Sequence, residues 1–191
     1  MGRIAVTQLT SLDGVMQSPG HADVPFKYRG WAVDFETGPE FDRFKLEEAR
    51  NAVALLLGRV TYEAMHAFWP TAAGAYADRL NELPKYVVSS TLTDLSWNVT
   101  VLGDDWLEEV ARLRSELDGE ILVYGSRRLS RALIGMGLVD ELRLQVYPVV
   151  LGAGDRLFGE TQAKIPLRLV ESRPFGDGVV SMIYAPAVAE G

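Results

Sequence analysis

Two segments of the chain place a short apolar run, a glycine and a helical pattern in immediate succession. The first apolar run covers residues 52–57 and is followed by Gly58, and the second covers residues 121–124 and is followed by Gly125. Unbroken apolar runs of this length are typical of strands that are covered on both faces. The chain is therefore expected to contain a parallel sheet with helices on both faces.

The other segments complete this expectation. Further strands are predicted at 4–10, 86–89, 98–101, 141–150, 167–171 and 179–184, and further helices at 41–48 and 106–117. The last two strands flank Gly176-Asp177-Gly178, which favours an antiparallel hairpin. The 191 residues suit one domain, 1–191, with an α/β fold: a mixed, mostly parallel sheet with an antiparallel C-terminal edge.

Charge and composition exclude several functions. A net charge of -7 argues against nucleic-acid binding, and the absence of cysteine excludes disulfides, thiolate zinc sites and a cysteine nucleophile. His21 and His66 lack the partners that a metal site needs, so no metal is expected. The charge pairs Glu47-Glu48 and Asp104-Asp105 are interpreted as solvent-exposed helix surface. No apolar stretch approaches the ~20 residues of a membrane span, so we expect a cytoplasmic protein without membrane contact.

The first strand–glycine–helix junction is a candidate phosphate site. Free N–H groups and the helix dipole favour an anion where a helix begins at the carboxyl end of a strand. Gly58 permits close approach, Arg59 adds a cation and Thr61 adds a hydroxyl. The alternative is that Gly58 only makes the turn, Thr61 caps the helix and Arg59 is solvated.

Two further strand ends carry similar groups. Gly125, Ser126 and Arg127 form the second junction, whose alternative is a capped helix with a basic first turn. Ser89 and Ser90 follow another strand and could bind a phosphate or simply form a turn. Three such ends in one domain indicate a dinucleotide with three phosphates.

The first strand leads into candidate substrate residues. Asp13 follows this strand and could bind a substrate amide or move a proton, although an ordinary Asp-Gly turn with Gly14 is the alternative. The long loop 17–39 is interpreted as a lid. Its aromatic residues could stack on a flat heterocycle or pack onto the domain: Phe26, Tyr28, Trp31 and Phe35.

These motifs, taken in order, resemble a known family. The segments that carry the resemblance are Ser11-Leu12-Asp13-Gly14, Leu57-Gly58-Arg59-Val60-Thr61-Tyr62-Glu63, Lys85-Tyr86-Val87-Val88-Ser89, Leu122-Val123-Tyr124-Gly125-Ser126, Leu138-Val139-Asp140-Glu141-Leu142-Arg143-Leu144 and Pro148-Val149-Val150-Leu151-Gly152-Ala153-Gly154. Together they resemble the dihydrofolate-reductase-like family that includes the reductase domain of the riboflavin-biosynthesis deaminase-reductase. The resemblance spans nearly the whole chain.

The resemblance implies NADPH as hydride donor and a heterocyclic or carbonyl substrate. At the level of the family, the substrate is an aminouracil. It assigns the cofactor phosphates to Gly58, Arg59, Thr61, Gly125, Ser126 and Arg127, the 2′-phosphate to Ser89 and Ser90, and the nicotinamide and substrate to Asp13 and Gly14. Trp31 and Phe35 are expected at the substrate. The resemblance also implies a homodimer, with residues 141–150 at its interface. Two alternatives remain: a non-catalytic module that binds a planar ligand, and a general carbonyl or quinone reductase.

Overall fold

The computed structural model describes residues 1–20, 25–159 and 164–187. Its strands form one eight-stranded sheet with the order β4-β3-β2-β5-β1-β6-β8-β7. The strands are β1 (Arg3–Ser11), β2 (Ala52–Gly58), β3 (Lys85–Val88), β4 (Val99–Leu102), β5 (Glu120–Tyr124), β6 (Glu141–Tyr147), β7 (Leu167–Phe175) and β8 (Val179–Pro186). The helices are α1 (Gly38–Asn51), α2 (Arg59–His66), α3 (Ala75–Glu82), α4 (Trp106–Glu116) and α5 (Arg127–Gly135), with a 3-10 turn at Trp69–Thr71.

The predicted sheet is confirmed. The first six strands of the chain pair in parallel, whereas β8 is antiparallel to both β6 and β7. The hairpin between β7 and β8 turns at Gly176-Asp177-Gly178, as its sequence indicates. All strand ends that carry the predicted site residues therefore lie along one edge of the sheet.

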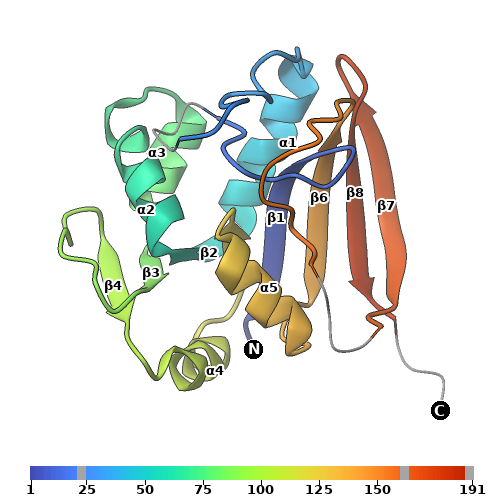
Figure 1. Ribbon diagram of the computed structural model, residues 1–191. Coiled ribbons are helices and arrows are strands. Elements are labelled where there is room, and N and C mark those ends of the chain that lie inside the picture. Colours follow the sequence, from blue (N-terminus) through green and yellow to red (C-terminus); the bar gives the residue numbers. More distant parts are fainter. Residues whose placement is uncertain (21–24, 160–163, 188–191) are drawn as a thin grey trace.

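Helices cover the sheet on both faces (Figure 1). Helices α4 and α5 pack on one face through an apolar cluster that includes Val6, Val123 and Leu133, all fully buried. Helices α1, α2 and α3 pack on the other face, where Leu57, Tyr62 and Leu80 are fully buried. The two faces of β2 and β5 are thus both apolar, which explains their unbroken hydrophobic runs.

A third cluster is aromatic and lies where β6 and β8 meet the start of α1. The rings of Trp31 and Phe35 meet the ring of Tyr147 edge-on at 5.4 and 5.6 Å between centroids. On the other side, Phe41 of α1 packs edge-on against Phe175 at 5.3 Å. The loop aromatics therefore pack onto the domain, which was one of the two expectations for them.

Two local expectations need correction or extension. Helix α3 was not predicted, because its only buried residues, Ala77 and Leu80, give a weak pattern. The homodimer interface expected at residues 141–150 stays a prediction; because β6 lies between β1 and β8 inside the sheet, a partner would contact it through a face of the sheet and not through a free edge. Glu48 was expected at the surface, but its side chain is 2% exposed. His21 lies outside the described residues.

Candidate functional site

The carboxyl ends of β3, β2 and β5 are neighbours in the sheet order. The chain continues from them into Ser89-Ser90, into α2 and into α5 respectively. In open α/β sheets, ligands bind at this edge. The three segments that the sequence singled out for phosphate binding thus lie side by side.

The two strand–glycine–helix junctions are joined by hydrogen bonds. The backbone N–H of Gly58 donates to Ser126 Oγ at 2.8 Å, and the N–H of Ser126 donates to Thr61 Oγ1 at 2.8 Å. Gly125 and Ser126 both adopt left-handed backbone, with φ of 50° and 52°. A Cβ on Gly125 would lie 3.1 Å from Thr61 Oγ1, so the close approach of the two turns, together with the positive φ, favours glycine there.

Gln8 of strand β1 forms hydrogen bonds with the turn of the second junction. The side-chain amide of Gln8 donates to the carbonyl of Gly125 at 2.6 Å and to Ser130 Oγ at 3.0 Å. Ser130 Oγ itself donates to the same carbonyl at 2.9 Å. Both side chains are buried, and together they saturate the carbonyl of Gly125 with hydrogen bonds.

The two predicted cations, Arg59 and Arg127, lie in the first turns of α2 and α5. Arg59 is exposed and pairs with Glu63 on the next turn of α2, with Nη1 and Oε1 3.3 Å apart. Arg127 pairs with Asp155 at 2.7 Å. Exposed pairs of this kind contribute little stability, so an anionic ligand can compete for either guanidinium.

The two serines after β3 differ in their roles. Ser89 Oγ accepts hydrogen bonds from the backbone N–H groups of Thr91 and Leu92 at 3.0 and 2.9 Å, which is the turn-forming role. Its hydroxyl proton can still be donated to an anion. Ser90 is exposed beside it.

Asp13 ties two loops together. Its carboxylate accepts hydrogen bonds from Ser11 Oγ at 2.7 Å and from the N–H groups of Leu151 and Gly152 at 3.1 and 3.0 Å. Arg156 adds an ion pair at 3.3 Å. The Ser11 hydroxyl and these N–H groups lower the pKa of Asp13 to about 2, so the group is a carboxylate at neutral pH. Gly14 follows with a φ of 79°.

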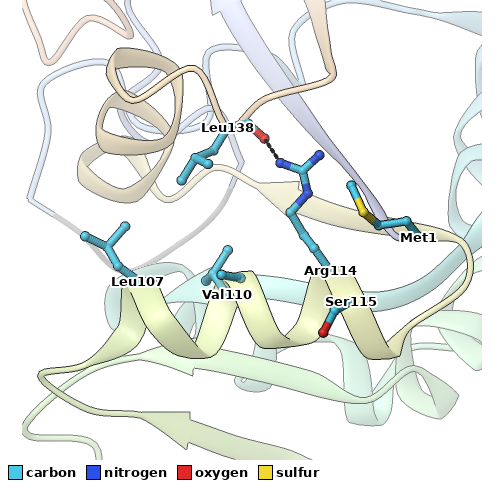
Figure 2. Close-up of a pocket in the computed structure, with 7 residues that line it drawn as sticks. Met1, Leu107, Val110, Arg114, Ser115 and Leu138 are labelled. Atoms are coloured by element: carbon cyan, nitrogen blue, oxygen red, sulfur yellow. Dashed lines mark hydrogen bonds between the residues drawn. The ribbon is translucent and has the colours of Figure 1, made fainter.

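Two of the hollows on the surface of the described residues bear on the site. One, of about 320 Å³, is lined by residues 149–151 after β6 and by five residues of the loop before α1: Tyr28, Arg29, Trp31, Asp34 and Phe35. The other, of about 270 Å³, is lined by Met1, Leu138 and one side of α4, where the guanidinium of Arg114 donates to the Leu138 carbonyl (Figure 2). The second lies by the start of β1, away from the strand ends described above. Only the first adjoins the candidate site.

A buried ionic layer lies between α1 and the sheet, and sequence reasoning missed it. Glu48 contacts Lys45, accepts from Tyr124 Oη at 3.2 Å and faces Arg143 Nη1 at 3.4 Å. Burial raises the pKa of Glu48, but the charges of Lys45 and Arg143 outweigh burial and the pKa is lowered. Burial also lowers the pKa of Lys45, and Glu48 opposes that shift. The helical spacing of Lys45 and Glu48 with Phe41 and Phe44 was the signal that could have placed Glu48 inside.

Two classes of site find no support in the described part of the chain. Residues 1–20, 25–159 and 164–187 contain no group of three or more His, Cys, Asp or Glu side chains that could hold a metal ion. Among the same residues, no helix is both long and apolar enough to span a bilayer.

The fold is shared with solved structures of the dihydrofolate reductase class. A Shewanella sp. PV-4 protein whose name refers to riboflavin biosynthesis superposes with a TM-score of 0.79 at 20% identity, covering 97% of this chain and 99% of that one. Dihydrofolate reductase from Enterococcus faecalis, complexed with NADP(H), gives a TM-score of 0.65 at 17% identity, with 97% of each chain covered. A pyrimidine reductase-like protein from Corynebacterium diphtheriae gives 0.67 at 14% identity, covering 97% and 92%. The chain therefore has the dihydrofolate-reductase-like fold.

The family of the chain is assigned from its sequence. The model of the RibD C-terminal domain matches residues 3–181, and the chain belongs to that family. Two relatives from Bacillus subtilis (strain 168) are the uncharacterized proteins YyaP, 40% identical over 100 residues, and YwjB, 29% identical over 171 residues. The match covers 52% of this chain and 53% of YyaP, and 88% of this chain and 90% of YwjB. The family supports a reductase-like protein, as the sequence motifs indicate.

Proposed function

We propose that the protein is an NADPH-dependent reductase that transfers a hydride to a small heterocyclic or carbonyl substrate. The observation that carries this proposal is the pair of junctions joined through Ser126. The hydrogen bonds from Gly58 to Ser126 and from Ser126 to Thr61 bring the N-termini of α2 and α5 together at the carboxyl edge of the sheet. Two helix dipoles that converge on one place favour a ligand with adjacent phosphates.

The residues at this edge fit a phosphorylated dinucleotide. Backbone N–H groups after Gly58 and Gly125 would bind the phosphates, with Arg59 and Arg127 as counter-charges. Ser89 and Ser90 would bind the 2′-phosphate that distinguishes NADPH from NADH. A side chain at Gly125 would press on Thr61, with a Cβ 3.1 Å from its Oγ1, so glycine here keeps the two turns close together.

Bound NADPH supplies the hydride, and the protein has to orient and enclose the reacting groups. In this proposal Asp13 and Gly14 border the nicotinamide and substrate. Because Asp13 is a carboxylate with a pKa of about 2, its role is to hold the loop at residues 151–156 and not to donate a proton. Trp31 and Phe35 would cover the substrate and exclude water.

The cofactor assignment predicts the effect of one exposed side chain. Replacing Arg59 with alanine should weaken NADPH binding about tenfold, because a charge-assisted hydrogen bond to phosphate is lost, and should weaken NADH binding by a similar factor, because NADH carries the same pyrophosphate. The dissociation constants can be measured by nicotinamide fluorescence. Arg112→Ala is the matched control, since Arg112 also pairs with glutamates on its own exposed helix, α4. Equal NADPH affinity in the Arg59 variant and the wild type would remove Arg59 from the site.

We also propose that the protein is a homodimer with β7 at the interface. Strand β7 lies at the edge of the sheet, and its residues from Leu167 to Pro174 are all exposed. Leu169 and Val170 are 49% and 51% exposed, beside a shift in register that follows Leu169. An exposed apolar edge strand is a site where another chain can pair.

This arrangement predicts that a charge on β7 separates the protomers. Val170→Glu should shift the wild-type dimer to a monomer, because burial of a carboxylate at an interface is costly. Sedimentation velocity at micromolar concentration distinguishes the two species. Leu95→Glu is the control, since Leu95 is 57% exposed in the loop between β3 and β4, well away from β7. A monomeric wild type, or a dimeric Val170→Glu variant, would contradict the proposed interface.

A further inference from the structure

A carboxylate from a distant segment lies against the start of α5. Asp155, between β6 and β7, places Oδ2 2.7 Å from Nη2 of Arg127, the first residue of that helix. The first turn of α5 contains Arg127 and Arg128 and no acidic side chain. The positive end of the helix dipole lies at the same place. Asp155 therefore supplies the negative charge that this end of the helix lacks in its own sequence.

Backbone hydrogen bonds hold Asp155 in place. Its N–H donates to Gln17 Oε1 at 3.0 Å, and its carbonyl accepts from the N–H of Met16 at 2.9 Å. The guanidinium of the next residue, Arg156, donates to the carbonyl of Asp13 at 2.9 Å. A side chain on a backbone that is already fixed loses less conformational freedom when it forms an ion pair. The carboxylate of Asp155 is therefore held at the start of α5 at a small entropic cost.

This ion pair is less exposed than the pair at the other junction. The side chain of Arg127 is 28% exposed, whereas that of Arg59, which pairs with Glu63, is 45% exposed. Charges that are partly buried are screened less by water and salt. Asp155 therefore neutralises Arg127 more strongly than Glu63 neutralises Arg59. A phosphate that approaches Arg127 meets a cation that already has an anion beside it, and the two anions repel each other.

We propose that Asp155 sets the affinity for the cofactor, because its carboxylate competes with a cofactor phosphate for the guanidinium of Arg127. Phosphate binding breaks the ion pair, and the carboxylate returns to Arg127 as the phosphate leaves. Asp155 therefore favours release of the oxidised cofactor after hydride transfer, and product release limits the turnover of many enzymes. The assignment rests on the reductase function proposed above and adds to it a residue that opposes binding.

Titration calorimetry of the whole protein with NADPH and, separately, with inorganic pyrophosphate tests this assignment. Asp155→Asn should tighten the binding of both probes about fivefold, because it removes the competing charge and keeps the size of the side chain. Asp118→Asn is the matched control, since Asp118 is fully exposed, pairs with the N-terminal amine and lies just before β5. It should leave both affinities within about 1.5-fold of wild type. In an Arg127→Ala background, Asp155→Asn should change NADPH affinity by less than about twofold, because the shared cation is gone.

Three outcomes would overturn the assignment. Unchanged or weaker binding of both probes in Asp155→Asn would mean that Asp155 does not compete, and weaker binding would show that it holds Arg127 in its binding position. A fivefold gain that persists in the Arg127→Ala background would mean that Asp155 repels the phosphate directly. Binding of neither probe by the wild type or by Asp155→Asn would remove the anion site itself. Failure of the reductase function alone looks different, because pyrophosphate binding would still tighten in Asp155→Asn while NADPH fails to bind.

Discussion

Replacing Glu48 with leucine is expected to lower the free energy of unfolding by about 3–5 kcal/mol, the usual effect of leaving a buried charge unpaired. Glu48 is the acceptor for Lys45 and for Tyr124 and faces Arg143, so its loss leaves a buried ammonium without a counter-charge. Chemical denaturation followed by circular dichroism measures the change.

The neighbouring residue and the paired residue provide the controls. Glu47→Leu changes an exposed side chain on the same helix and should alter stability by no more than about 0.5 kcal/mol. The double variant Lys45→Met with Glu48→Leu removes both charges and should recover most of the loss. If Glu48→Leu were as stable as Glu47→Leu, the ionic layer would not be buried as described.

The same pair has a pH dependence with a definite sign. The pKa of Glu48 is lower in the folded chain than its ordinary value of 4.5. Its stabilising effect is therefore fully present above that value and is lost as the pH falls below it. The double variant should lose less stability than the wild type on acidification.

Replacing Gly125 with valine is expected to lower NADPH affinity at least about 100-fold, equivalent to about 2.7 kcal/mol. The backbone of Gly125 has a φ of 50°, which β-branched residues avoid, and an added Cβ would lie 3.1 Å from Thr61 Oγ1. The turn would have to shift, and the N–H of Ser126 would lose its bond to Thr61. Fluorescence titration with NADPH measures the loss.

A glycine at the far end of α5, the helix that follows Gly125, separates this effect from general loss of stability. Gly135 is the last residue of α5 and has open space around its Cβ position, so Gly135→Ala should bind NADPH like the wild type. Thermal unfolding shows that each variant is folded at the assay temperature. Wild-type affinity in a folded Gly125→Val variant would mean that the turn does not approach the cofactor.

The strand–glycine–helix junctions could be predicted because they are local. The apolar run before Gly58 and the run before Gly125 each determine their own element, and parallel strands then bring their ends to one edge. The hydrogen bond from Gly58 to Ser126 could not be predicted, since 68 residues separate its two ends. Sequence thus indicates which groups reach the edge but not how they are joined.

The buried ionic layer, in contrast to the junctions, was not predicted. Glu48 follows Phe41, Phe44 and Lys45 at helical spacing, so the pattern alone placed it on the inner stripe of α1. It was still interpreted as exposed, because carboxylates are rarely buried without a partner. Its direct partner is Lys45, one turn earlier on α1, and the charge of Arg143, which lies 95 residues away on β6, adds to it. The contribution of Arg143 could not be predicted from the helix alone.

The most direct test of the central claim is a titration of the purified protein with NADPH and, separately, with NADH, followed by nicotinamide fluorescence and thermal shift. A ligand that binds only the folded chain raises its melting temperature by mass action. The account predicts tight binding and a clear thermal shift with NADPH and weaker binding of NADH, which lacks the 2′-phosphate assigned to Ser89 and Ser90. Saturation by neither nucleotide would contradict the reductase and leave a planar-ligand-binding protein in its place.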